Sequence, residues 1–156
     1  MKSKPITAAS VPARKGQTFY PDSFAAQVQG RTKRKLGDLF DLANFGVNLT
    51  QLDPGAVSAL FHRHTTQDEF IFILEGSPML LVGDDEFPLA AGDCMGFKAG
   101  GNAAHQLINR SDELVTYIEM GDRSPNDEVE YPKDDIRVDL APDGSWIFSH
   151  KNGTHY

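Results

Sequence analysis

The chain has 156 residues and a formal net charge of −7 at pH 7, with 40% hydrophobic and 24% charged residues. This length fits one domain with its own core, and the composition is that of a globular protein rather than a disordered one. No apolar run approaches the length of a membrane-spanning helix, and the start, MKSKPITAAS, lacks the apolar core of a secretory signal. We therefore expect a single domain over residues 1–156, located in the cytoplasm, with no membrane partner.

Charge is distributed unevenly along the chain. Residues 1–35 hold eight of the fifteen Lys and Arg but one acidic residue, which leaves seven basic and 21 acidic residues for 36–156. The run RTKRK at residues 31–35 is a pattern found in nucleic acid-binding proteins. An acidic body repels phosphate backbones, however, and no stacking aromatic residue is interleaved with these cations. We expect no nucleic acid partner, and we interpret this segment as a basic arm packed over an acidic barrel of its own or a partner subunit.

Residues 1–44 are expected to form an N-terminal arm and leading strands. Residues 1–17 lack periodicity and contain two prolines, which indicates an irregular segment. Residues 21–29, PDSFAAQVQ, fit a short helical turn or a strand equally well. The alternating apolar residues of FGVNLTQL predict a strand over residues 45–52.

Short strands then alternate with turns, and no connection is long enough for a crossover helix. This rhythm is typical of a β-sandwich or barrel. Cys94, the single cysteine, precludes an internal disulfide, and we expect it to be a small buried thiol. The expected strands are residues 57–64, 68–74, 79–82, 86–89, 94–97, 104–109 and 114–120.

Residues 121–156 differ in character from the preceding strands. They are acidic, contain prolines and are weakly periodic, which indicates a C-terminal extension that follows the surface rather than a core element. Residues 136–140 fit an added edge strand. The apolar run Trp146, Ile147 and Phe148 would let the tail dock.

Two histidines and a glutamate suggest a metal site. His62 and His64 are two residues apart, so in a strand their side chains project to the same side, about 7 Å apart along the backbone. The polar run between His64 and Glu69 is long enough to turn the chain and return a carboxylate towards the same point. His105 begins a later strand and supplies a third nitrogen. This mixed nitrogen and oxygen set suits Fe, Mn, Zn or Ni better than Ca or Mg.

The same stretch resembles the first motif of the cupin superfamily, G-x5-H-x-H-x3,4-E-x6-G. The matching positions are Gly55, His62, His64, Glu69 and Gly76, and the first spacer is one residue longer than in the family.

A second stretch resembles the other cupin motif, G-x5-P-x-G-x2-H-x3-N. Lys98 stands where the family has proline, and four residues rather than two precede the histidine. Both departures fall in turns, so they affect the rim of the pocket more than the ligand set. The matching positions are Gly92, Gly100, His105 and Asn109.

This resemblance implies an all-β cupin double-stranded β-helix, a jelly-roll barrel with an N-terminal arm and a C-terminal extension. It implies a metal-binding barrel core over residues 45–120, with His62, His64, Glu69 and His105 as metal ligands. Beyond the motifs, the chain is similar to small bacterial cupins provisionally named sugar-phosphate isomerases. The alternative is that the four residues only pack or form hydrogen bonds, since some cupins have lost their metal.

Strand alternation extends the prediction to both faces of residues 68–74. If the metal ligands face inward, Leu60, Ile71 and Ile73 do so too and form an apolar floor. Phe70, Phe72 and Leu74 then face outward, where an apolar sheet face needs a covering layer. We expect a homodimer, with the N-terminal arm lying on its own sheet or crossing to the partner.

Three functions remain open for such a site. The first is Lewis-acid isomerase or lyase chemistry on a sugar, a sugar phosphate or a hydroxy or keto acid. Its general base would be Glu119 or Tyr117, which share one face of residues 114–120, or Lys98 at the pocket rim. The second is a dioxygenase-type reaction with Fe or Mn. The third is a non-catalytic small-molecule binding module, which the lack of a helix-turn-helix pattern makes less favoured.

Overall fold

The computed structural model describes residues 4–15, 18–140 and 146–156 as a protein built mainly of β-strands. The helical elements are η1 (Ala8–Ser10), α1 (Asp22–Ala25), η2 (Ala26–Val28) and α2 (Leu36–Leu39). The first strands are β1 (Arg14–Lys15), β2 (Arg31–Lys35), β3 (Phe45–Leu52), β4 (Arg63–His64), β5 (Glu69–Glu75) and β6 (Met79–Val82). The later strands are β7 (Asp85–Pro88), β8 (Cys94–Phe97), β9 (His105–Ile108), β10 (Val115–Asp122), β11 (Val129–Glu130), β12 (Arg137–Leu140) and β13 (Trp146–Ser149).

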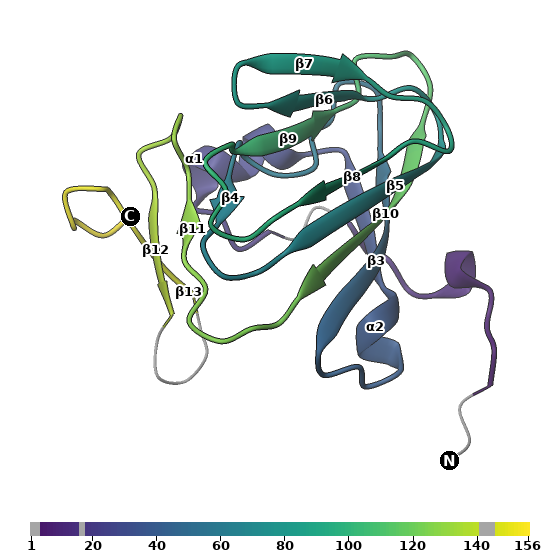
Figure 1. Ribbon diagram of the computed structural model, residues 1–156, viewed down its shortest axis with the longest axis horizontal. Coiled ribbons are helices and arrows are strands. Elements are labelled where there is room, and N and C mark those ends of the chain that lie inside the picture. The colour runs from purple at the N-terminus through teal and green to yellow at the C-terminus, as the bar shows by residue number, and fades with distance from the viewer. Residues whose placement is uncertain (1–3, 16–17, 141–145) are drawn as a thin grey trace.

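Two antiparallel sheets form the barrel. The larger has six strands in the order β1-β2-β3-β10-β5-β8, and the smaller has three in the order β7-β6-β9 (Figure 1). β4 pairs with β11, and β12 pairs with β13, in two further two-stranded sheets. Every described strand pair is antiparallel. The predicted all-β jelly-roll is confirmed.

The main core lies between the two sheets. Side chains from β3, β5 and β10 meet side chains from β6 and β9, and burial of this apolar surface stabilises the sandwich. The buried members are Leu52, Ala56, Ile71, Ile73, Leu80, Leu107, Val115 and Tyr117.

Strand β5 shows the expected alternation between its two faces. Ile71 and Ile73 are 8% and 0% exposed, whereas Phe72 and Leu74 are 37% and 40% exposed. Ile71 and Ile73 therefore face inward as predicted, whereas Leu60, the third residue of the expected floor, packs in a separate buried cluster. The outer face of β5 carries large apolar side chains.

The basic run of residues 31–35 is not an arm laid over the barrel. It forms β2, which pairs along its whole length with β3 and also with β1, so that it belongs to the large sheet. Residues 22–28 of the preceding segment adopt the helical alternative, as α1 followed by η2.

The predicted strand over residues 57–64 is wrong for most of its length. Only isolated bridges at Val57 and His62 and the short β4 remain. The carbonyl of Ala59 accepts a hydrogen bond from the Gln106 side chain at 2.7 Å, and the Ser58 hydroxyl accepts one from the backbone of Leu107 at 3.0 Å. Side-chain hydrogen bonds thus replace part of the ladder, so the chain bends before it reaches the histidines.

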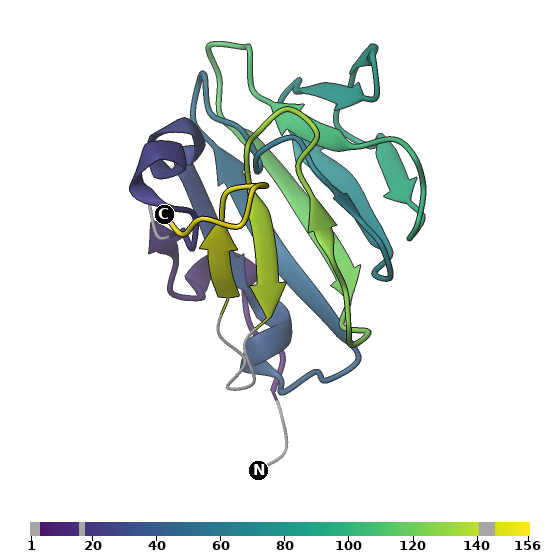
Figure 2. The ribbon, with the colours of Figure 1, turned by 90° about the vertical axis from the view of Figure 1, so that its left-hand side faces the viewer.

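The C-terminal extension also differs from a segment that only follows the surface. Tyr131 and Ile136 are 6% and 2% exposed and join Val28 and Leu60 in a second buried cluster. Phe148 of β13 packs against this cluster. The extension and the segment around α1 lie side by side in front of the large sheet (Figure 2).

The expectation that Cys94 is a buried thiol is wrong. Cys94 is exposed rather than buried, because it begins β8 at the edge of the large sheet. The side chain of Trp146 lies outside the described part of the molecule. Among the described residues, no helix is long and apolar enough to cross a membrane.

Candidate metal centre

Four predicted ligands meet at one end of the cavity between the sheets. The Oε2 atom of Glu69 lies 3.6 Å from Nε2 of His62, 3.5 Å from Nε2 of His64 and 2.9 Å from Nε2 of His105. Glu69 is the first residue of β5, His64 ends β4 and His105 begins β9. Among the described residues, the ligand atoms of His62, Glu69 and His105 all lie within 4.8 Å of one another, so these three could hold an ion, and His64 is not part of this group.

Backbone pairing places His62 beside His105. Each residue donates its N–H to the carbonyl of the other, with nitrogen–oxygen distances of 3.1 and 2.7 Å. The two ring centroids lie 4.7 Å apart. Phe97 of β8 stacks on the His105 ring with a centroid separation of 3.6 Å, which fixes the orientation of that imidazole. Two residues that are far apart in the sequence thereby become neighbours.

Hydrogen bonds at Nδ1 determine which nitrogen of two histidines carries the proton. Nδ1 of His62 lies 2.8 Å from the carbonyl oxygen of Leu60, and Nδ1 of His64 lies 2.5 Å from Oδ2 of Asp127. Both oxygens are acceptors, so both Nδ1 atoms must be donors. In a neutral imidazole the Nε2 atom then has a free lone pair, which is the form that binds a metal.

The Nε2 lone pairs of His62 and His64 and the carboxylate oxygen of Glu69 all carry negative partial charge, so they repel one another unless a cation lies between them. Lone pairs on histidine Nε2 atoms face a carboxylate oxygen, and within the described chain this buried Oε2 of Glu69 has no hydrogen bond of ordinary geometry. Metal bonds of about 2.0–2.2 Å place neighbouring ligand atoms about 3–3.5 Å apart. The observed separations of 2.9–3.6 Å fit one shared ion.

The pKa shifts of Glu69 and His105 favour an ionised carboxylate and a neutral imidazole, which are the forms that bind a metal. Burial raises the pKa of Glu69, but contacts with His105 and His62 outweigh it, and the resulting pKa lies below the usual range. Burial lowers the pKa of His105, more than the neighbouring carboxylate raises it. A carboxylate beside a neutral imidazole is the combination that binds a divalent cation.

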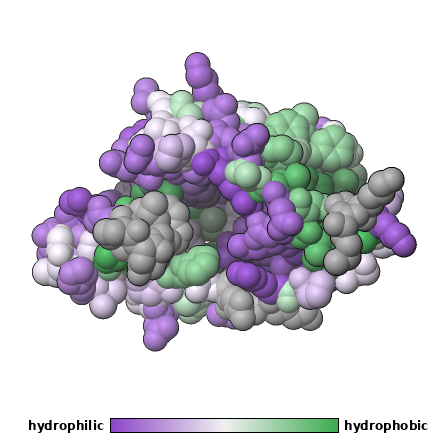
Figure 3. All heavy atoms as spheres, turned by 90° about the horizontal axis from the view of Figure 1, so that it is seen from below, coloured by the Kyte–Doolittle hydropathy of each residue, from purple (hydrophilic) through white to green (hydrophobic). Residues whose placement is uncertain are grey.

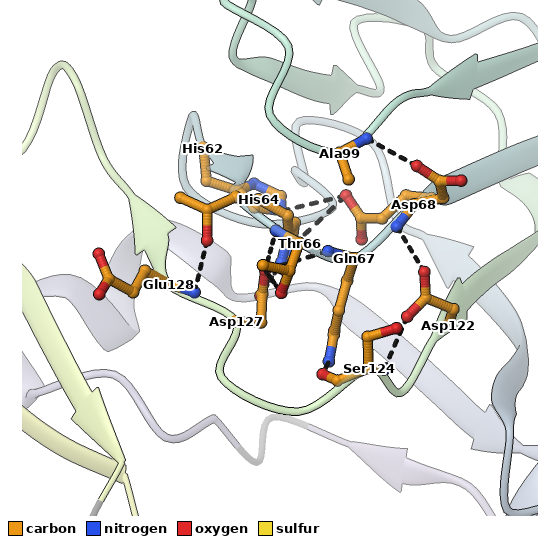
Figure 4. Close-up of polar contacts among 12 residues, drawn as sticks. His62, His64, Thr66, Gln67, Asp68, Ala99, Asp122, Ser124, Asp127 and Glu128 are labelled. Atoms are coloured by element: carbon orange, nitrogen blue, oxygen red, sulfur yellow. Dashed lines mark hydrogen bonds and ion pairs between the residues drawn. The ribbon is translucent and has the colours of Figure 1, made fainter.

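Asp127 supports the site from the C-terminal extension. Its Oδ1 atom accepts hydrogen bonds from the backbone N–H groups of Thr66 and Gln67, at 2.9 and 3.2 Å, while Oδ2 accepts a hydrogen bond from Nδ1 of His64 (Figure 4). Burial raises the pKa of Asp127, but these hydrogen bonds outweigh it and lower the pKa. Sequence reasoning missed this residue, because no fixed spacing connects it to the histidines.

A cavity of about 900 Å³ opens beside the proposed ligands, and two of the predicted catalytic residues, Glu119 and Tyr117, line it. The Tyr117 hydroxyl donates a hydrogen bond to Oε2 of Glu119 at 3.1 Å, and Asn48 donates one to Oε1 at 3.0 Å. Lys33 forms an ion pair with the same carboxylate. Burial raises the pKa of Tyr117 well above its usual value, so this hydroxyl keeps its proton and acts as a donor.

The third predicted catalytic residue lies elsewhere. Lys98 follows β8 in an exposed turn and is not among the residues that line the cavity. Asn109, the last position of the second motif, is fully buried and has a structural role. Its side chain donates hydrogen bonds to the carbonyls of Leu52 and Glu113, at 2.9 and 2.7 Å.

Comparison with known proteins identifies the family. The sequence model of the cupin domain matches residues 48–121. A sugar phosphate isomerase of the cupin superfamily from Silicibacter pomeroyi is 36% identical, with a TM-score of 0.90 over 98% of this chain and 96% of that one. The chain belongs to the cupin superfamily.

Two further structures extend the comparison of this cupin. A protein of Acidithiobacillus ferrooxidans, provisionally named a sugar phosphate isomerase, is 30% identical, with a TM-score of 0.71 over 81% of this chain and 80% of that one. The polyketide cyclase RemF of Streptomyces resistomycificus, at 20% identity and a TM-score of 0.66 over 91% of this chain and 89% of that one, shares the fold alone. No curated protein matches the chain.

Proposed function

We propose that this cupin is a metal-dependent enzyme that isomerises, or eliminates a group from, a small oxygenated metabolite. The observation that supports it best is the convergence of three imidazole Nε2 atoms on the buried Oε2 of Glu69, at 2.9–3.6 Å. His62, His64, Glu69 and His105 would hold one divalent transition ion such as Fe, Mn, Zn or Ni. Cupins commonly bind a metal, and these four residues occupy the ligand positions of the family motif.

A divalent ion at this place supplies Lewis-acid polarisation of a substrate carbonyl or hydroxyl oxygen. The protein contributes an apolar surround, because Ile71, Leu80 and Leu107 line the same cavity. Such a lining excludes water and strengthens the electrostatic interactions inside the cavity. A sugar, a sugar phosphate, or a hydroxy or keto acid offers the paired oxygens that this site would orient.

Glu119 is the best-placed general base. It lies opposite Ile71 in the pairing of β10 with β5, and Glu69 is two residues from Ile71 on the same face. Diagonal neighbours of this kind lie about 7–8 Å apart, which leaves room for a small substrate between the two carboxylates. Glu119 would remove the proton from the carbon next to the substrate carbonyl and return it to the former carbonyl carbon. Tyr117 holds the carboxylate in place through its hydroxyl.

The name of one relative supports the isomerase alternative over the lyase alternative. The 36% identical cupin from Silicibacter pomeroyi is named a sugar phosphate isomerase. The four proposed ligands and the base beside them support the same activity class for the present chain.

The test is exchange of substrate hydrogen with solvent. The chain loaded with Mn, Zn, Fe or Ni is incubated in D₂O with aldoses, ketoses, their phosphates, and hydroxy and keto acids, and deuterium incorporation and product formation are followed by NMR. We expect metal-dependent incorporation next to a carbonyl together with isomer formation. Oxygen consumption by the Fe-loaded protein without such exchange would contradict the proposal and favour the dioxygenase alternative. Saturable binding without any turnover would favour the binding module.

We also propose that the enzyme is a homodimer formed through the outer face of the large sheet. Phe72 and Leu74 of β5 are 37% and 40% exposed there, and Ile118 lies beside Phe72 on β10. Hydrophobic side chains gather towards the right of the molecule in Figure 3, which views it from below. A second copy would remove this apolar surface from water.

A further inference from the structure

The basic strand β2 presents alternate residues to the cavity. Its register with β3 places Lys33 opposite Thr50 and Lys35 opposite Asn48, on the same face of the sheet as Tyr117 and Glu119. Arg14 of β1 lies opposite Lys33. Among the described residues, four cationic ones line the cavity: Arg14, Arg31, Lys33 and Lys35. We call them the β2 wall.

The β2 wall is more basic than the protein around it. The whole chain has a net charge of −7, yet in the described part of the chain the acidic residues that line the cavity are Asp22, Glu119 and the proposed metal ligand Glu69. A concentration of cations inside an acidic protein attracts anionic small molecules into the cavity.

Neighbouring groups neutralise part of this charge. Lys33 pairs with Glu119, and Nζ of Lys35 lies 3.3 Å from Oδ2 of Asp38. Arg31 donates one guanidinium hydrogen bond to the carbonyl of Ser58, which orients the side chain but does not neutralise its charge. A guanidinium has five N–H donors, so Arg31 keeps several for a ligand.

We propose that the β2 wall is a binding subsite for the phosphate monoester of the substrate whose carbonyl end faces the metal ligands. The proposal rests on the proposed function, since both describe one substrate in one cavity. In the large sheet β2 and β5 are separated by β3 and β10. Three spacings of about 4.8 Å place their backbones about 14 Å apart, a distance that the inward side chains shorten. A phosphorylated sugar spans such a gap better than a short hydroxy acid.

A phosphate group also suits the wall chemically. It carries close to two negative charges at neutral pH, and arginine binds it through paired N–H···O hydrogen bonds. The bound group would lie between Arg14, Arg31 and Lys35, whereas Lys33 positions Glu119.

The test uses inorganic phosphate as the probe and calorimetric titration of the full-length chain. Removal of two cations by Arg14→Met with Lys35→Met should weaken phosphate binding by about tenfold or more, a loss of about 1.4 kcal/mol. The control is Arg34→Met, which removes a cation from the same strand on the opposite face, where Arg34 donates to Gln51. We expect phosphate affinity to change less than about twofold in the control, and wild-type affinity to fall with added salt.

A second variant separates the subsite from the metal centre. His105→Ala removes a proposed metal ligand and should leave phosphate binding intact. Loss of phosphate binding in His105→Ala, with retention in the Arg14 and Lys35 double variant, would overturn the proposal by placing phosphate on the ion. Failure of the wild-type chain to bind phosphate, or equal competition by malonate, would also overturn it. Phosphate binding at the wall without turnover of any substrate would leave the subsite standing and reject the proposed function.

Discussion

Oδ2 of Asp127 accepts a hydrogen bond from Nδ1 of His64 at 2.5 Å, although the two residues are 63 positions apart in the sequence. The Asp127 side chain is 4% exposed, so this contact is sheltered from solvent. Backbone N–H groups of Thr66 and Gln67 hold the other carboxylate oxygen. The C-terminal extension thereby fixes the tautomer of a proposed metal ligand that lies in the barrel.

Replacement of Asp127 by asparagine should weaken metal binding. Loss of the negative charge makes His64 a poorer ligand and no longer enforces its tautomer, so we expect a 10- to 100-fold rise in the metal Kd, of the order found for such supporting residues. Competition with a chelator of known affinity measures this change. Asp122→Asn is the control, because Asp122 also accepts backbone hydrogen bonds, from Asp68 and Ser124 at 2.8 and 2.7 Å. Equal losses in both variants would show that loop anchoring, not the contact with His64, is responsible.

Removal of a proposed ligand should abolish stoichiometric metal binding. His62→Ala and His105→Ala each delete one Nε2 atom from the group around Glu69, and neither residue belongs to the hydrophobic core between the sheets. Elemental analysis should find no bound metal, while circular dichroism should find an intact β-fold. His150→Ala is the control, because His150 pairs with Asp135 outside the cavity. Retention of one metal per chain in both site variants would reject the ligand set.

The general base can be assigned by comparing two variants. Glu119→Gln keeps the shape of the side chain but removes its basicity, so we expect a loss of about 10²- to 10⁴-fold in kcat with unchanged metal content. Lys98→Met should change kcat by less than about threefold, because Lys98 does not line the cavity. The measurement is the initial rate of solvent deuterium incorporation into the substrate identified in the NMR screen. A larger loss of kcat in Lys98→Met than in Glu119→Gln would identify Lys98 as the general base.

Two motif glycines should differ in how they tolerate alanine. Gly55 and Gly76 have nearly equal positive φ angles, 81° and 85°, so alanine at either position costs about 1–2 kcal/mol in conformational energy. A Cβ atom at Gly76 would also lie 2.8 Å from the carbonyl oxygen of Leu114, whereas one at Gly55 has no atom within 4 Å. Denaturant unfolding should therefore find Gly76→Ala the less stable variant. Equal stability would mean that the loop before β10 moves aside at no cost.

The proposed dimer interface lies close to a thiol whose reactivity can be measured. Cys94, the single cysteine, is opposite Phe72 in the pairing of β5 with β8. Phe72→Glu should convert the dimer to monomer by light scattering and should speed alkylation of Cys94. The control is Phe87→Glu, which changes a 47% exposed phenylalanine on β7 of the other sheet. A monomeric wild-type protein at working concentration would reject the interface.

Features that depend on local spacing along the chain could be predicted from the amino-acid pattern. The alternation of apolar residues predicted β3, β6 and β8 with the observed bounds, and glycine turns separated the short strands of the barrel. The two cupin motifs also predicted that His62, His64, Glu69 and His105 lie close together, and the structure brings their side chains to one place. Side chains alternate between the two faces of a strand, and particular residues favour turns, so both features can be recognised in the sequence.

The distant groups that surround those four residues are known only once the chain has folded. Asp127 reaches His64 from the C-terminal extension, and β2 turns Lys33 and Lys35 into the cavity where a basic arm was expected. Tyr131, in a stretch with weak periodicity, becomes part of a buried cluster that joins the extension to Val28 and Leu60. Each of these contacts depends on which strands become neighbours and in which register. That choice is made by burial of apolar surface over the whole barrel, and no local pattern encodes it.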